Sequence, residues 1–391
     1  MKILFLSRWY PFPADNGIKI RILNLLRAIS REHRVTLLSF HDPHRQPSTP
    51  NTENAEIEKV HVVPWRDFDP GSLRGYKGLL ARQPRSLVDV HSSEMERLIR
   101  HEAASRHDLV IASELPMAAY YRCFRHLPSL FEDPELGVIH QRYHDAASFG
   151  SRVRHGLTWI KYQHFMRHLL PSFRYCTVAS EQEKTLLAQA VPEYHAVEVI
   201  PNTVDLGSYS SYHTEPKVRS LIFCGSLRFS PNLEAARWFL EYVFPLVLRR
   251  FPDLHLTVTG DHGDLLPGDF PGLRLAGQVD DVRPLITSAW ASLAPIRSGS
   301  GTRVKILEAM ALKTPVIATS KGAEGLSVRH GQHILIADQP NDFADAVIAV
   351  LADPELRRHL AEQAYALVQN EYDSSVVGPR FKRLVEQVAL Q

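Results

Sequence analysis

The chain has 391 residues, and its 45 Lys and Arg against 43 Asp and Glu give a formal net charge of +2 at pH 7. This length favours two domains of roughly 150–200 residues over a single small module, and a content of 44% hydrophobic residues is enough for a sizeable core. The near-zero net charge excludes a general attraction to polyanions, so we expect no nucleic-acid partner.

The cysteines and the hydropathy pattern bear on cellular location. The cysteines are few and far apart and form no CxxC pair, which argues against a zinc or redox site and for reduced thiols. The longest uncharged stretch, residues 284–296, has 13 residues, whereas a membrane-spanning helix needs about 20. We therefore expect a cytoplasmic protein without a transmembrane segment.

Short apolar runs alternate with amphipathic stretches along most of the chain, which is typical of a parallel β-sheet covered by helices on both faces. A first series of predicted strands covers residues 2–7, 35–40, 60–65, 108–113, 129–133, 175–180 and 197–202. A second series covers residues 220–225, 255–260, 273–277, 291–296, 315–320 and 334–337.

The polar stretch between the two series indicates a domain boundary. We predict an α/β protein with an N-terminal domain over residues 1–205, a linker over 206–219, a C-terminal domain over 220–373, and a last helix over 374–391 with the option of packing back on the first domain. Both domains are expected to be doubly wound and to bind ligands beyond the carboxyl ends of their strands. Two such domains facing each other would form a cleft.

Residues 295–319 carry the strongest functional signal: a strand, a Gly/Ser loop and a helix predicted to start near Thr302 as its N-cap. Free backbone N–H groups and the positive end of the helix dipole make such a helix start a phosphate site. Arg303 and Lys305 fall in the first turn, where cations are disfavoured unless an anion is bound. Glu308 lies on the same face as Lys305 and has two oxygens that accept hydrogen bonds from a vicinal diol. The alternative is a plain surface pair of Lys305 and Glu308.

Two motifs in the first half also offer chemistry. Carboxylates follow a predicted strand in the run FEDPE at 131–135, where Asp133 would accept the proton of an acceptor hydroxyl or orient a sugar, with a simple turn at Pro134 as the alternative. Asp15-Asn16-Gly17 follows the first strand, as a ligand-binding or a plain tight turn. It lacks the GxGxxG fingerprint, which argues against a nicotinamide-dependent oxidoreductase.

Residues 142–174 combine six Lys and Arg with one acid and several interleaved aromatics. This composition suits a helix that rests on an anionic membrane surface or grips a phosphorylated acceptor, and the alternative is a solvated helix face. Histidines cluster around the same segment, but no third ligand is placed to complete a zinc site, so we expect no metal.

The run GSGTRVKILEAMALKTPVIAT, followed by GAEGL, resembles the nucleotide-sugar site of retaining GT-B glycosyltransferases of family 4. Supporting pieces are ILFLSRWYPFPADNGIKIR near the N-terminus, IPNTVD at 200–205 and FCGSLRFSPNLEAARWF at 223–239. The resemblance implies a GT-B fold, in which two Rossmann-like domains face a cleft, with the donor in the C-terminal half and the acceptor in the N-terminal half.

The resemblance also implies roles for individual donor-site residues. Glu308 matches the second glutamate of the family's EX7E pattern, which binds the ribose hydroxyls of the donor. Ser300 stands where the first glutamate would be. Backbone N–H groups of Ser300, Gly301 and Thr302 would then contact the transferred sugar.

For the diphosphate, many members of the family use an Arg and a Lys at positions where this chain has Ser226 and Pro231. A departing diphosphate still needs about two positive charges. We therefore expect Arg228, Arg303 and Lys305 to supply them, the alternative for Arg228 being a solvated loop arginine.

The resemblance thus predicts retaining transfer of a sugar from a UDP- or GDP-sugar to a hydroxyl of a glycan or lipid-linked acceptor, with no metal or other cofactor. The enzyme would be cytoplasmic and peripheral at the inner membrane face. Gly225 would contact the donor, and Gly17 would let the backbone approach the donor's distal phosphate or the acceptor. Asp133 and the cations Arg303 and Lys305 would act in catalysis. The alternative is a non-catalytic nucleotide-sugar-binding protein on the same fold.

Overall fold

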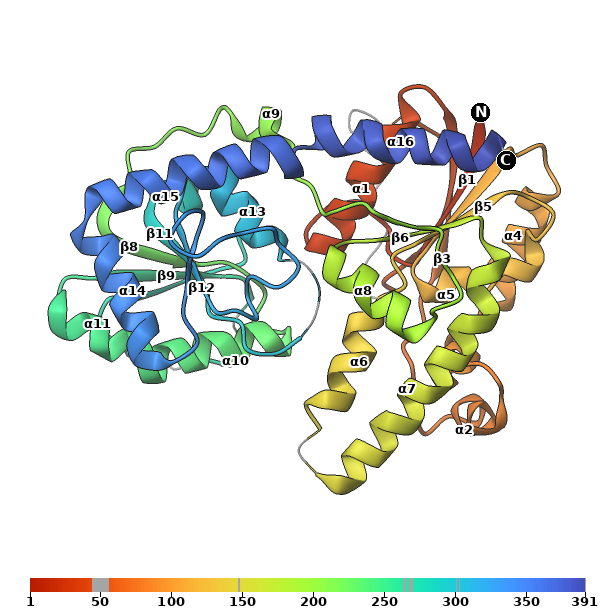
Figure 1. Cartoon of the computed structure of the whole chain (residues 1–391), viewed down its shortest axis with the longest axis horizontal. Helices are drawn as coiled ribbons and strands as arrows, with labels where there is room; N and C mark the ends of the chain where they lie inside the picture. The colour runs from red at the N-terminus through yellow and green to blue at the C-terminus, as the bar shows by residue number, and fades with distance from the viewer. Residues whose placement is uncertain are drawn as a thin grey trace. The chain divides into compact units, whose positions relative to one another are not determined.

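The computed structural model of the chain describes residues 1–43, 56–146, 148–261, 263, 265–266, 270–299, 301 and 303–390. These residues form two compact units (Figure 1). One unit combines Met1–Pro201 with the segment from Val377 onward, and the other is Asn202–Val376. The first unit is therefore built from both ends of the chain, and the second from one continuous stretch.

The first unit contains a parallel β-sheet with the strand order β3-β2-β1-β4-β5-β6-β7. Each strand overlaps an apolar run that was predicted as a strand, because central strands covered on both faces are continuously apolar. The strands are β1 (Lys2–Ser7), β2 (Arg34–His41), β3 (Ile57–Pro64), β4 (Leu109–Ser113), β5 (Ser129–Glu132), β6 (Tyr175–Val178) and β7 (Val197–Val199).

Helices cover both faces of this sheet, since successive side chains of a strand point to opposite faces. Ile3 and Phe5 of β1 pack with α1 and α16, whereas Leu4 and Leu6 share a core with α4 and α7. The helices are α1 (Gly17–Ser30), α2 (Leu73–Leu80), α3 (Arg85–Val90), α4 (Ser93–Ala103), α5 (Leu115–Ala118), α6 (Leu136–His144), α7 (Phe149–Leu169), α8 (Glu181–Ala190) and α16 (Ser374–Leu390), with short 3₁₀ turns η1 (Tyr121–Cys123) and η2 (Leu170–Ser172).

Most of α16 is part of the first unit's core, far from its neighbours in sequence. Its side chain Phe381 is fully buried among residues of β1 and α1. At its end, Arg174 Nη1 donates a hydrogen bond to Val388 O at 2.7 Å, and Lys382 Nζ lies 2.6 Å from Glu32 Oε1. The last helix therefore completes the face of the sheet that α1 begins.

The second unit contains another parallel sheet, with the order β10-β9-β8-β11-β12-β13, and every strand again matches a predicted apolar run. Its strands are β8 (Lys217–Phe223), β9 (His255–Thr259), β10 (Leu273–Gly277), β11 (Ala289–Ala294), β12 (Val316–Ala318) and β13 (Leu335–Ile336). Its helices are α9 (Leu206–Tyr209), α10 (Ser230–Trp238), α11 (Phe244–Arg250), α12 (Arg283–Ser288), α13 (Val304–Ala311), α14 (Pro340–Ala352) and α15 (Pro354–Leu367), with π-helical segments η3 (Phe239–Val243) and η4 (Val368–Tyr372).

The boundary between the units differs from the predicted one. Residues 206–219, predicted as a linker, contain α9 and the start of β8. The first unit ends at Pro201, because Val204 and Leu206 are buried in the second unit's core and Val204 pairs with Asp373. Burial of these two apolar side chains therefore holds the start of the predicted linker in the second unit.

Both sheets reverse their strand order, between β1 and β4 in the first unit and between β8 and β11 in the second. Doubly wound sheets bind ligands beyond the carboxyl ends of strands at such a reversal. The loops after these strands are therefore where each unit is expected to hold its functional residues. In the part of the chain that the structure covers, we find no helix with the length and apolar character to cross a membrane.

Candidate functional site

In the second unit, Lys305 of α13 lies next to the residues that follow β8. Its Nζ donates a hydrogen bond to Asn232 Oδ1 at 2.8 Å and lies 4.8 Å from the ring centre of Phe223, the last residue of β8. A Cβ atom on Gly225 would come within 2.9 Å of this Nζ and 2.6 Å of Asn232 Nδ2. Gly225 thus leaves the room that both side chains occupy, and the structure brings two predicted donor-site residues together.

The surroundings of Lys305 favour an anion beside it. Its pKa is lowered to about 8, chiefly by burial and also by Arg303, while Cys224 and Glu308 act in the opposite direction. A bound phosphate would raise this pKa again, because an opposite charge stabilises the protonated form. The ammonium group therefore stands at the start of α13 with its positive charge only partly compensated.

Glu308 lies one helical turn after Lys305 on α13. Its Oε1 accepts a hydrogen bond from the Tyr209 hydroxyl at 3.0 Å. Burial raises the pKa of the Glu308 carboxyl, which the Tyr209 hydrogen bond opposes, and burial together with Glu308 raises the pKa of Tyr209. Arg283 lies 5.6 Å from the centre of the Tyr209 ring. A diol bound at Glu308 would share this carboxylate with Tyr209.

The loop before α13 ends differently from the prediction. The helix begins at Val304 rather than near Thr302, because the backbone of Arg303 is extended, and Arg303 contributes no side-chain cap. The predicted contacts Ser300 and Thr302 lie outside the described residues. Gly301 has φ +95°, a left-handed conformation that glycine adopts without strain, so its backbone turns at the entrance to the helix.

The other two predicted cations make contacts of their own. Arg303 Nη2 donates hydrogen bonds to Gly299 O at 2.8 Å and Ser298 O at 3.3 Å, so this side chain braces the glycine loop. Arg228 Nε donates to Asp261, and its side chain is 72% exposed. Of the three cations, Lys305 is the one that contacts Asn232 and occupies the space beside Gly225.

In the first unit, the predicted residue Gly17 is the first residue of α1. Asn16 caps this helix, since its Oδ1 accepts a hydrogen bond from Lys19 N at 3.1 Å. Lys19 Nζ pairs with Asp15 Oδ1 at 2.8 Å. In the structure, the turn before α1 is thus held by its own capping contacts.

A buried ion pair joins α1 to the carboxyl ends of β4 and β5. Arg21 Nε lies 2.7 Å from Glu132 Oε1, and Glu132 Oε2 accepts a hydrogen bond from Ser113 Oγ at 2.5 Å. Arg21 Nη1 also donates to Ile200 O at 2.8 Å. Glu132, the first carboxylate of the FEDPE run, therefore has a structural role.

Asp133 and Glu135 differ from Glu132, because neighbouring cations compensate their negative charge only in part. The pKa of Asp133 is raised to about 7, first by burial and then by Glu183, although Arg21 Nε lies 3.7 Å from Asp133 Oδ2. The pKa of Glu135 is raised to about 7 by burial and by Asp133. Both residues have positive φ, 52° and 51°, which is uncommon without glycine. Groups that exchange protons near neutral pH suit acid–base chemistry.

Glu114 completes this carboxylate cluster and was not predicted. It follows β4 directly, burial and Glu135 raise its pKa well above the ordinary value, and both its oxygens are buried with no hydrogen-bond partner among the described residues. Arg8, which follows β1, places its Nη1 3.7 Å from Glu114 Oε2 and packs over the ring of Trp65. A sequence signal existed, because Glu114 directly follows the predicted strand over residues 108–113.

Asn232 and Tyr209 were also missed in the second unit. Asn232 was part of the quoted run at 223–239, but nothing in its spacing distinguished it from a helix-start residue. Tyr209 lies in the stretch that was predicted as a linker. Both contacts join residues far apart in sequence, which periodicity does not detect.

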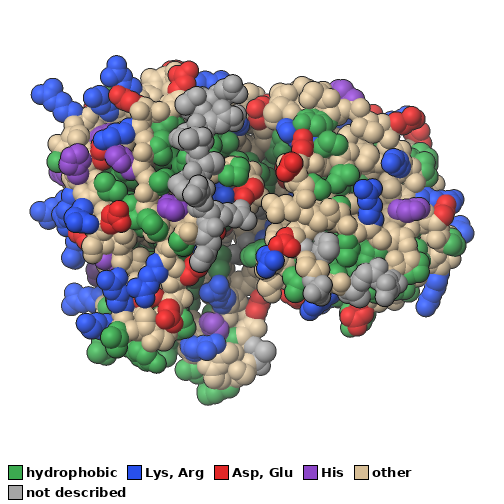
Figure 2. All heavy atoms as spheres, turned by 180° about the vertical axis from the view of Figure 1, so that it is seen from behind, with side chains coloured by type: hydrophobic (Ala, Val, Ile, Leu, Met, Phe, Trp, Pro, Cys, Tyr) green, Lys and Arg blue, Asp and Glu red, His purple; other side chains and the backbone are tan. Residues whose placement is uncertain are grey.

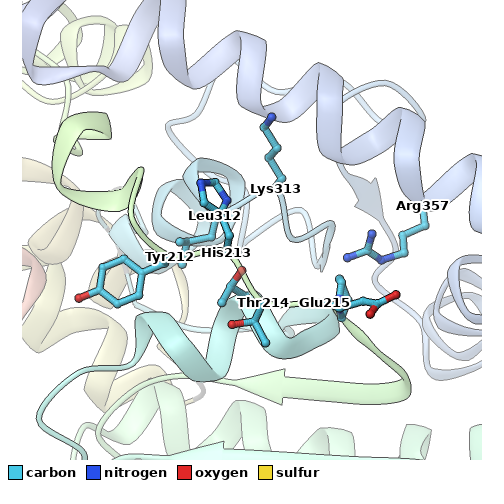
Figure 3. Close-up of a pocket in the computed structure, with 9 residues that line it drawn as sticks. Tyr212, His213, Thr214, Glu215, Leu312, Lys313 and Arg357 are labelled. Atoms are coloured by element: carbon cyan, nitrogen blue, oxygen red, sulfur yellow. The ribbon is translucent and has the colours of Figure 1, made fainter.

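A surface pocket of the second unit is lined by Tyr212, Leu312 and Lys313 among others (Figure 3). It is next to Pro216, just before β8, and Lys313, just after α13, so it is at the amino end of the strand rather than at its carboxyl end. Figure 3 shows the Arg357 and Glu215 side chains at one end of it. Its position separates it from the loops that follow β8 and β11.

The predicted histidine pairs lie within helices of the first unit. His140 and His144 place their Nε2 atoms 3.0 Å apart, and His168 Nδ1 lies 2.7 Å from His164 O. In the described ranges, we find no group of three or more His, Cys, Asp or Glu side chains arranged to hold a metal ion.

Comparisons with known proteins agree with this division into two units. Residues 15–208 match the family model "Glycosyltransferase Family 4", and residues 218–353 match "Glycosyl transferases group 1". The chain is 31% identical over 410 aligned residues to phosphatidyl-myo-inositol mannosyltransferase of Mycobacterium tuberculosis, covering 97% of this chain and 95% of that protein. It is 26% identical over 169 residues to an uncharacterised 44.6 kDa protein in the cps region of Klebsiella pneumoniae, spanning 40% of this chain and 44% of that protein.

A solved structure shows the same fold. Anabaena HepE, crystallised in complex with UDP and glucose, aligns with a TM-score of 0.68 and 15% identity, covering 99% of this chain and 100% of its own. The two parallel-sheet Rossmann-like domains define a GT-B glycosyltransferase fold, as the sequence predicted. The chain belongs to the family 4-like group 1 glycosyltransferases, and its activity class is glycosyl transfer.

Proposed function

We propose that the protein is a retaining glycosyltransferase that moves a sugar from a UDP- or GDP-sugar to a hydroxyl of a glycan or lipid-linked acceptor. The observation that carries the proposal is the contact of Lys305 with Asn232 beside Gly225, one helical turn from Glu308. This arrangement lies at the carboxyl end of β8, where a doubly wound sheet binds nucleotides.

The donor would bind with its diphosphate at the start of α13. Lys305 and the free N–H groups of the helix would stabilise the diphosphate, while Glu308 would accept hydrogen bonds from the ribose. Backbone groups of Ser300, Gly301 and Thr302 would contact the transferred sugar. The complex of HepE with UDP and glucose supports a uridine nucleotide as the first donor to try.

In the proposed reaction, the bond between the anomeric carbon and the diphosphate oxygen breaks, and the diphosphate leaves with the electron pair. The acceptor oxygen forms its bond on the same face of the sugar, and its proton passes to the departing phosphate oxygen. Lys305 stabilises the charge that develops on this leaving group, with Arg303 holding the loop that precedes the helix.

The carboxylate cluster of the first unit would receive the acceptor. Asp133, with Glu135 and Glu114 beside it, would accept a hydrogen bond from the attacking hydroxyl and hold its oxygen in a reactive orientation. The mannosyltransferase relative supports an inositol-containing lipid or a similar polyol as acceptor, and the cps-region relative supports a glycan. We infer a cytoplasmic enzyme that works at the inner membrane face.

Replacing Glu308 by Gln tests the donor site directly. We expect UDP or GDP, whichever binds the parent protein, to bind about 10- to 100-fold more weakly, because one charge-assisted hydrogen bond is worth about 1.5–3 kcal/mol. Isothermal titration calorimetry measures this difference. Glu355→Gln, at an exposed position of α15, is the matched control and should bind like the parent.

The same titrations, followed by assays with radiolabelled nucleotide-sugars, separate the proposed enzyme from its alternative. Binding with subsequent hydrolysis or transfer supports the proposal. Binding with neither would identify a non-catalytic nucleotide-sugar-binding protein, which the Ser300 and Ser226 departures favour. Unchanged affinity in Glu308→Gln would refute the assignment of the ribose site.

A further inference from the structure

Large apolar side chains are exposed on two neighbouring helices of the first unit. Leu80 of α2 is 94% exposed and Phe149 of α7 is 86% exposed. Among the described residues, exposed large apolar side chains gather in these two helices more than elsewhere. We define the α2–α7 face by Leu73, Tyr76, Leu79, Leu80, Phe149, Val153, Leu157 and Ile160.

The apolar residues of α7 fall on two opposite sides of the helix. Phe149, Val153, Leu157 and Ile160 are spaced by four, four and three residues, so they form one stripe. The buried residues Tyr162, Phe165, Met166 and Leu169 fall on the other side and join the core of the first unit. The outer stripe is therefore not part of the hydrophobic core of the first unit.

In α2, the inner side is made of glycine and the outer side of large residues. Gly75 and Gly78 are buried, and a Cβ atom on Gly78 would come within 2.9 Å of Arg85 Cα. Lys161 of α7 donates hydrogen bonds to Gly78 O at 2.7 Å and Leu79 O at 3.2 Å. These contacts bring α2 beside α7, and the two helices lie side by side in Figure 1.

The charged side chains within α2 and α7 themselves are all Arg and Lys. The sequence has no Asp or Glu between Asp69 and Asp89, nor between Asp145 and Glu181. Exposed cations lie in both stretches, namely Arg74, Lys77, Arg82, Arg152 and Arg154. In Figure 2, hydrophobic and basic side chains mix over the lower end of the unit seen at the left.

We propose that the α2–α7 face docks the protein on an anionic lipid bilayer. Exposed apolar side chains would enter the headgroup region while the surrounding Arg and Lys contact lipid phosphates, which is the pattern of peripheral membrane helices. A second copy of the chain fits less well, because a two-fold interface would place these cations against themselves. This proposal rests on the proposed function, because it describes how an enzyme with a membrane-associated acceptor would reach the membrane. Its test, however, involves no sugar transfer.

The test is co-sedimentation of the full chain with sucrose-loaded vesicles. We expect binding to vesicles that contain phosphatidylglycerol and at least about tenfold weaker binding to phosphatidylcholine alone, because each Lys or Arg near an anionic surface contributes to attraction. Leu80→Ser combined with Leu157→Ser should weaken binding to the anionic vesicles by about tenfold or more. Arg74→Glu combined with Arg152→Glu should weaken it at low salt.

Controls use apolar side chains that are exposed elsewhere. Val218→Ser and Leu390→Ser, at 62% and 86% exposed positions, should bind vesicles like the parent. As a measure of folding that does not involve lipid, all variants should keep the parent's UDP affinity and unfolding midpoint. Equal binding to both vesicle types, unchanged binding of the Leu80/Leu157 variant, or self-association through this face without vesicle binding would overturn the proposal. Vesicle binding without glycosyl transfer would overturn the proposed function alone.

Discussion

Replacing Lys305 by Met is expected to lower kcat by about 10²- to 10³-fold, the range observed when one preorganised donor to a developing negative charge is removed. Methionine fits the room beside Phe223 and carries no charge that would have to be buried there. The protein should therefore keep its stability while the departing diphosphate loses its main cation. Initial rates of sugar transfer from a radiolabelled donor measure the effect.

The charge state of Lys305 gives a second readout. Because its pKa is lowered to about 8, part of the unliganded protein has a neutral Lys305 just above that pH. A diphosphate raises this pKa, so nucleotide binding there should take up protons in the parent and not in Lys305→Met. Calorimetry in two buffers with different ionisation enthalpies detects this uptake. Lys313→Met, at the other end of α13 with its Nζ over the Tyr365 ring, should behave like the parent. Parental turnover in Lys305→Met would show that another group neutralises the diphosphate.

The second large effect is expected for Asp133→Asn, with kcat/KM lowered by about 10²-fold, because the acceptor hydroxyl loses the carboxylate that orients it. With a pKa of about 7, the Asp133 carboxyl is protonated in part of the parent molecules at neutral pH. Parent activity should rise as pH increases through about 7, because the ionised form accepts the hydrogen bond of the acceptor hydroxyl. The Asn side chain does not ionise, so the activity of Asp133→Asn should increase with pH only to the extent that ionisation of Glu135 contributes.

The pH dependence of stability distinguishes a chemical role of Asp133 from a role in packing. The folded-state pKa of Asp133 is above its ordinary value of 3.8, so the folded protein binds the proton more tightly than the unfolded chain. This carboxyl therefore destabilises the fold as pH rises from about 4 to about 7, and Asp133→Asn should lose less stability over that range than the parent. Urea unfolding at several pH values measures this. Asp145→Asn, at an exposed position of the same unit, should change neither property, and a stability loss that accounts for the activity loss would rule out the chemical role.

The strands were predictable because both sheets are buried on both faces, which leaves continuous apolar runs such as LVIAS of β4. The same reasoning singled out the candidate functional loops, since it identified where strands end. It failed at the domain boundary near residues 206–219, where Val204, just before this stretch, and Leu206 within it were too few to produce a period and yet are buried. Burial there depends on α13 and η4, which are about a hundred or more residues away in sequence.

The sequence singled out residue types for the candidate site but not the partners that these residues contact. Lys305 and Glu308 were found through their spacing on one helix, whereas Asn232 and Tyr209, which bond them, come from distant elements. Arg303 and Arg228 were singled out as cations near a helix start, but their bonds to Gly299 O and Asp261 depend on loop conformation. Which charges compensate one another is decided by tertiary contacts, and local sequence does not contain that information.

The return of α16 to the first sheet has a consequence for biosynthesis. During translation, the Ile3 and Phe5 side of β1 stays uncovered until Phe381 and its neighbours, which follow the whole second unit in the chain, have been synthesised. The second unit, the continuous stretch from Asn202 to Val376, needs no later part of the chain to complete its fold. We expect the second unit to mature first and the first unit to become protease-resistant only once α16 has been synthesised, reversing the usual order of co-translational folding.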